Sequence, residues 1–90
     1  MRLEARAAID VCMMAADRGL VVSRIEGGVW RHPGFESRLD CIWDGRDPPL
    51  SVDSARENNE EAALFVNSKA ESECNVFILT APSVLGWSEL

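Results

Sequence analysis

The chain is poor in the side chains from which catalytic centres are usually built. Its 90 residues contain one histidine, three cysteines and no tyrosine. His32 lies between Arg31 and Pro33, in a segment typical of an exposed turn. The cysteines form no C-x-x-C pair, and no Ser–His or Cys–His pairing stands out. We therefore expect neither an enzyme nor a metal or other cofactor site.

Long apolar runs and positive charges are also scarce. The longest uncharged run is shorter than the ~18 residues that a membrane span needs, and Asp10 interrupts the N-terminal apolar pattern, so we expect no signal peptide. Nine Lys and Arg residues oppose fifteen Asp and Glu residues, for a net charge of −6. This balance disfavours direct binding to nucleic acid or anionic lipid, and it favours a basic partner.

The cysteine pattern indicates reduced thiols. Cys12, Cys41 and Cys74 are odd in number and widely spaced, which fits a cytoplasmic protein better than a disulfide framework. Cys12 and Cys41 are predicted to be small core residues.

Two segments predict helices. Apolar residues recur at spacings of three and four between Leu3 and Ala16, and Gly19 can close the last turn of such a helix. Further along, Ser54 and Glu57 have the spacing of a capping box, in which hydroxyl and carboxylate satisfy each other's free backbone amides. We expect the second helix to run from there to about residue 72.

The remaining segments predict strands separated by glycine and proline. Gly27-Gly28 lacks the spacing of a phosphate-binding loop and is predicted to be a hairpin turn, with another turn at Pro33-Gly34. The last apolar run should be the most buried strand. The expected strands are residues 20–25, 29–30, 35–43 and 76–79.

This order of elements predicts an α+β fold. Two helices are expected to pack on one face of a three- or four-stranded, mainly antiparallel sheet, in the order helix, strands, helix, strand. The length predicts a single domain over residues 1–90, in which residues 81–90 form a C-terminal tail that contains Trp87.

Acidic and aromatic residues gather in the middle of the chain. Eight carboxylates fall within 26 residues, between Glu36 and Glu61. An acidic surface around aromatic anchors fits a basic protein partner, although an ordinary solvated face over aromatic core residues would show the same pattern. Asn58 could tie the preceding loop's backbone or border an interface. The predicted partner-binding residues are Trp30, Phe35, Glu36, Asp40, Trp43, Asp44, Asp47 and Asn58.

Short motifs along most of the chain resemble the immunity proteins of the fifth E-group colicin, a ribonuclease that cuts tRNA anticodons. The resemblance covers about residues 3–80. It rests on the order and spacing of R-A-A-I-D-V-C at 6–12, I-E-G-G at 25–28, P-G-F at 33–35, E-N-N at 57–59 and F-I at 77–78.

The resemblance implies a small cytoplasmic inhibitor that binds the basic C-terminal ribonuclease domain of a toxin. Its surface would occupy the RNA-binding cleft in place of the anticodon, which agrees with the acidic charge. Glu36 and Arg38 carry charges opposite to those at the corresponding positions of the family member. The second predicted helix is also more acidic at Glu60-Glu61 than in that protein. We therefore expect a related toxin, delivered by a bacteriocin or a contact-dependent system. The alternative is an acidic adaptor domain that binds another basic protein.

Overall fold

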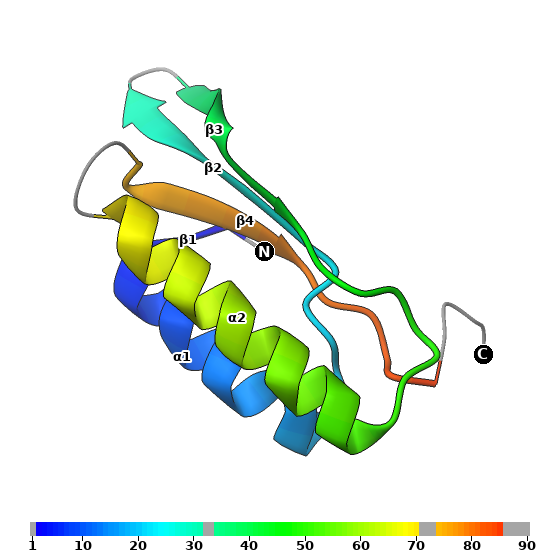
Figure 1. Cartoon of the computed structure of the whole chain (residues 1–90). Coiled ribbons are helices and arrows are strands. Elements are labelled where there is room, and N and C mark those ends of the chain that lie inside the picture. The colour runs from blue at the N-terminus through cyan, green and yellow to red at the C-terminus, as the bar shows by residue number, and fades with distance from the viewer. Residues whose placement is uncertain (1, 32–33, 71–73, 86–90) are drawn as a thin grey trace.

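The computed structural model describes residues 2–31, 34–70 and 74–85, and in them two helices pack against one face of a four-stranded sheet (Figure 1). The strands lie in the order β1-β4-β2-β3, and each neighbouring pair is antiparallel. The predicted α+β fold is confirmed, with one additional strand before the first helix. The elements are β1 (Arg2–Leu3), α1 (Ala5–Ala15), β2 (Arg24–Arg31), β3 (Gly34–Asp44), α2 (Val52–Ala70) and β4 (Val76–Thr80).

The first helix lies where the apolar spacing predicts it, although Met14 of that spacing is 47% exposed. Ala8, Cys12 and Ala15 are buried, at the helical spacings of four and three. A short 3-10 turn continues α1, and Gly19 ends it with a φ of 73°. The prediction that Leu3 belongs to this helix is wrong, because Leu3 pairs with Phe77 as part of β1.

The second helix begins three residues after the last proline of the preceding loop, and its cap differs from the prediction. The backbone N–H of Ser54 donates to the hydroxyl of Ser51, 3.1 Å away, so Ser51 rather than Ser54 satisfies the first turn. The carboxylate of Glu57, expected to complete a capping box, instead accepts a bond from Arg46. The predicted end at residue 72 lies outside the described residues.

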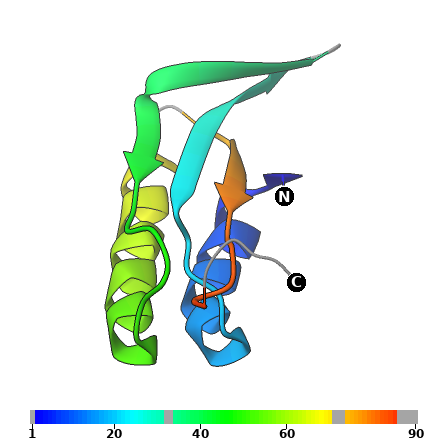
Figure 2. The ribbon, with the colours of Figure 1, turned by 90° about the vertical axis from the view of Figure 1, so that its right-hand side faces the viewer.

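The prediction of a turn at Gly27-Gly28 is wrong, because β2 runs through both glycines. A Cβ on Gly27 would lie 2.7 Å from the Cβ of Cys41, and one on Gly28 would lie 2.2 Å from a carbonyl oxygen of β3. The glycines therefore permit close approach between strands. The pairing register also shifts here, so that residues 38–41 of β3 lie opposite Gly27 alone. This bulge bends β3 sharply, as Figure 2 shows.

Alternate residues of β4 face the helices. Phe77 and Leu79 are buried in the core, while Val76 and Ile78 are half-buried on the opposite face. The run predicted to be the most buried strand is therefore buried on one face only. Residues 20–23 are likewise not a regular strand, apart from a bridge between Leu20 and Ser83.

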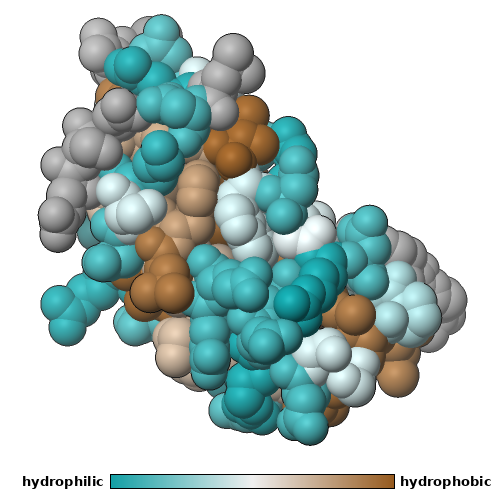
Figure 3. All heavy atoms as spheres, viewed as in Figure 1, coloured by the Kyte–Doolittle hydropathy of each residue, from teal (hydrophilic) through white to brown (hydrophobic). Residues whose placement is uncertain are grey.

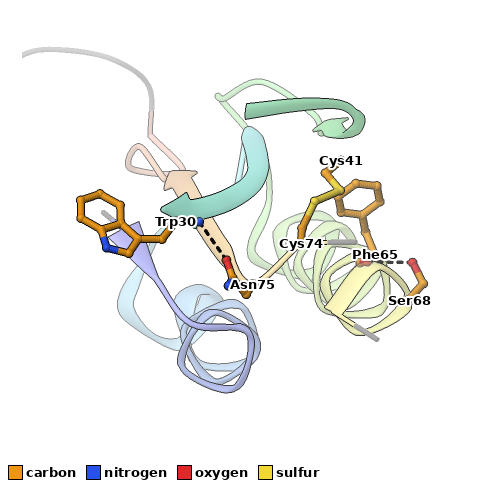
Figure 4. The surroundings of a disulfide bond; sticks show 6 residues. All are labelled: Trp30, Cys41, Phe65, Ser68, Cys74 and Asn75. Atoms are coloured by element: carbon orange, nitrogen blue, oxygen red, sulfur yellow. Dashed lines mark hydrogen bonds between the residues drawn. A yellow bond between two sulfur atoms is a disulfide. The ribbon is translucent and has the colours of Figure 1, made fainter. Parts of the chain in front are cut away.

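The prediction of reduced thiols is also wrong for two of the three cysteines. Cys41 of β3 forms a disulfide with Cys74, which precedes β4 (Figure 4). The fold brings together two residues separated by 33 positions, which their spacing did not reveal. Cys12 is free and lies in the core, as predicted, and its burial raises the pKa of the thiol to about 11.

Candidate partner-binding surface

One face of the sheet is left uncovered by the helices, since α1 and α2 lie on the same side (Figures 1 and 2). Glu26 lies at the centre of this open face, between Ile42 of β3 and Ile78 of β4. All three side chains are half-buried, whereas the neighbouring Ile25 points into the core. We define the open face by the outward residues Arg24, Glu26, Ile42, Asp44, Val76, Ile78 and Thr80.

The charges of the open face are linked through Arg24. Its Nε donates to the carboxylate of Glu26 at 3.0 Å, and its Nη1 donates to Asp44. The hydrogen bonds to Glu26 and then to Asp44 raise the pKa of the arginine, which stays charged. Two carboxylates thus share one cation, and the group retains a negative charge. Exposed ion pairs of this kind contribute little to stability, so a partner's cation can compete for these carboxylates.

The β2–β3 hairpin carries an aromatic pair at its outer end. Trp30 is the cross-strand partner of Phe35, and Trp30 is 43% exposed. The backbone N–H of Trp30 donates to the side chain of Asn75, 3.1 Å away, as Figure 4 shows. The tryptophan also borders a surface hollow of about 500 Å³, whose other lining residues are Glu4, Ala5, Arg6, Ala70, Cys74, Asn75 and Val76.

An acidic loop follows the other end of the hairpin. Asp44 ends β3, and Asp47 is exposed three residues later. Between them, Arg46 pairs with Glu57 at 3.0 Å and approaches Glu61 at 3.9 Å. The charges of α2, whose surface is largely hydrophilic in Figure 3, are therefore partly neutralised from within the chain.

The predicted binding residues fall into an exposed group and a buried group. Trp30, Glu36, Asp40, Asp44 and Asp47 are exposed, and Phe35 is half-buried. Their positions extend from one end of β3 to the loop beyond its other end. These residues therefore lie on both sides of the sharp bend in β3.

Trp43 and Asn58 do not fit the predicted role of direct contacts. Trp43 is half-buried and faces the helices, where its ring centre lies 6.4 Å from that of Phe65. Asn58 is only 1% exposed, and it accepts the backbone N–H of Arg46, which confirms the alternative that it ties the preceding loop. The sequence reasoning also missed Glu26, since a turn was expected directly after it. His32 and Trp87 lie outside the described residues.

Neither a metal-binding group nor a membrane-spanning helix is found among the described residues. Within 2–31, 34–70 and 74–85, no group of three His, Cys, Asp or Glu residues is placed to hold a metal ion. No helix in those ranges is long and apolar enough to cross a membrane. What the fold presents instead is an open, acidic sheet face with an exposed tryptophan nearby, the kind of surface that binds another protein.

Comparison with known proteins identifies the family. The model of the family described as colicin-E5 Imm protein matches residues 1–82. The chain is 59% identical over 87 residues to the immunity protein CdiI of Burkholderia pseudomallei, which covers 97% of this chain and 79% of that protein. It is 35% identical over 80 residues to the colicin-E5 immunity protein of Escherichia coli, with 89% and 96% of the two chains covered.

These matches place the chain in the class of toxin-inhibiting immunity proteins, which are inhibitors and not enzymes. The chain belongs to the colicin-E5 immunity protein family.

Proposed function

We propose that this protein binds the basic C-terminal ribonuclease domain of a toxin that cuts tRNA anticodons, and that it blocks the toxin's RNA-binding cleft. The toxin would be delivered by a bacteriocin or a contact-dependent system. The observation that carries the proposal is the open face of the sheet, where Glu26 and Asp44 present carboxylates beside half-buried isoleucines. The names of the relatives support a toxin as the partner, and one of them names a colicin.

The proposed mechanism is substitution of the inhibitor's groups for those of the RNA. A cleft that binds RNA phosphates uses Lys and Arg side chains, and carboxylates accept charge-assisted hydrogen bonds from the same groups. RNA bases stack on aromatic side chains, and the exposed ring of Trp30 could stack in place of a base. Because inhibition would require only occupation of the cleft, no residue of this chain needs to act chemically.

We propose that this inhibition takes place in the cytoplasm of the producing cell. A tRNA ribonuclease has its substrate there, so the inhibitor must meet the toxin in that compartment. The Cys41–Cys74 disulfide is unusual for a cytoplasmic protein. The redox state of these two cysteines, measured in cells that express the protein, therefore tests this proposal. Reduced thiols would agree with a cytoplasmic location.

Co-expression tests the proposal in cells. An immunity gene is expected to lie immediately downstream of its toxin gene. That neighbouring toxin is expressed with and without this protein, and we expect survival only when both are present. Equal death in the two cultures would contradict the proposal.

A second experiment tests the mechanism with purified proteins. Cleavage of tRNA by the toxin's nuclease domain should stop at one equivalent of this protein. The association rate should fall steeply as salt rises, because a protein of net charge −6 approaches a basic cleft. Binding without loss of cleavage would instead favour the adaptor role, and a salt-independent rate would exclude electrostatic steering.

A further inference from the structure

Two consecutive asparagines of α2 are buried where a helix ordinarily places apolar side chains. Asn58 is 1% exposed and Asn59 is 2% exposed. Both face Val22, a residue outside the strands whose backbone groups need partners because they are buried. The N–H of Val22 donates to Asn59 Oδ1 at 2.9 Å, and its carbonyl accepts from Asn58 Nδ2 at 2.8 Å. The two side chains thus replace a missing strand partner.

Only one of the two asparagines also reaches the acidic loop. Asn58 Oδ1 accepts the backbone N–H of Arg46 at 2.8 Å. The loop passes so close that a Cβ on Gly45 would lie 2.7 Å from this oxygen. Asn59 Nδ2 instead donates to the carbonyl of Leu20 at 3.1 Å. Its side-chain oxygen also accepts a hydrogen bond from Asn58 Nδ2.

The contacts of Arg46 fix the start of the loop at two points. Its backbone is bound to Asn58, and its Nη1 donates to the carbonyl of Ser54 at 3.2 Å and to Glu57 at 3.0 Å. Asp47 follows directly and is exposed. Asp44, in contrast, is held independently of Asn58 by its pairing with Arg24 in the sheet.

We infer that Asn58 is a positioning residue for toxin binding, which holds the carboxylate of Asp47 in place through the backbone of Arg46 and does not touch the toxin itself. This inference rests on the proposed function. A loop that is already ordered loses less conformational entropy when the complex forms. Loss of the Asn58–Arg46 hydrogen bond should therefore lower affinity as well as stability.

The experiment compares Asn58→Ala with Asn59→Ala, a matched control of equal burial on the same turn. The probe is the nuclease domain of the toxin encoded immediately upstream, made catalytically inactive. Both variants should unfold at lower urea concentration. Under conditions where each is folded, Asn58→Ala should raise Kd about tenfold and Asn59→Ala less than threefold.

Double-mutant cycles separate positioning from general destabilisation. In an Asp47→Ala background, Asn58→Ala should have almost no further effect on Kd, because the carboxylate that it positions is gone. In an Asp44→Ala background its tenfold effect should remain. Equal losses for Asn58→Ala and Asn59→Ala, or additive effects with Asp47→Ala, would overturn the inference.

Two further results separate this inference from the proposed function. If the wild-type protein does not bind the nuclease domain, the proposed function fails. If it binds but Asp47→Ala has no effect on Kd, the inference alone fails. Should Asn58→Ala not fold, hydrogen exchange of the wild-type protein decides, since the Arg46 amide should be protected to the same degree as that of Val22. Exchange of Arg46 at the rate of an unprotected loop amide would overturn the inference.

Discussion

Reversing the charge of Asp47 tests where the partner binds. Asp47 is exposed, and no ion pair between described residues involves it. Asp47→Lys should therefore leave the free energy of unfolding within about 0.5 kcal/mol of the wild type. Asp44 is less suitable, because its reversal would also place a cation against Arg24.

The expected loss of affinity follows from the charge separation. Two unit charges 4 Å apart interact by about 1 kcal/mol in water and about 4 kcal/mol where the effective dielectric constant is about 20. Reversal replaces attraction by repulsion, so the change is twice the pair energy. If one toxin cation lies near Asp47, even the value for water corresponds to about 2 kcal/mol, or roughly a thirtyfold rise in Kd.

Asp10→Lys is the matched control for this change. Asp10 is exposed on α1, in the helical layer, and its reversal alters the net charge by the same two units. This control should change the free energy of binding by less than about 0.5 kcal/mol. Titration calorimetry at two salt concentrations measures both variants, and urea unfolding confirms that both are folded. An equal or larger loss for Asp10→Lys would refute the assignment of the interface to the hairpin and its loop.

Three further predictions concern the scaffold of this surface. Replacing Cys41 and Cys74 together by alanine should lower the free energy of unfolding by about 3 kcal/mol; an unchanged urea midpoint would contradict the disulfide. Because burial raises the pKa of Cys12 from 9.0 to about 11, folding favours the protonated thiol. Stability should be retained below pH 9 and fall by up to about 1.4 kcal/mol per unit between pH 9 and 11, and Cys12→Ala should lack this fall. Gly28→Ala should cost about 1–3 kcal/mol, since its Cβ would meet β3 backbone; Gly34→Ala, whose Cβ meets nothing within 4 Å, should change stability by less than about 0.5 kcal/mol.

Features that depend on residues close together in the chain could be read from the sequence. The presence of the first helix follows from helical periodicity, and Gly19 ends the helix because only local backbone geometry is involved. The strand predicted over residues 35–43 likewise corresponds to β3. The acidic charge and its concentration near the hairpin are properties of composition, and they pointed to a basic partner before any contact was known.

Features that depend on distant segments were decided only by the tertiary structure. Gly27-Gly28 has the composition of a turn, but the strands on either side approach so closely that glycine is required within β2. The sequence left two roles open for Asn58, and its hydrogen bonds to Val22 and to the loop residue Arg46 decide between them. Local preferences amount to only about 1 kcal/mol per residue, so pairing and burial between elements override them. Which carboxylates face outward was therefore settled by the packing of the sheet on its helices, because that packing determines which face of each strand is covered.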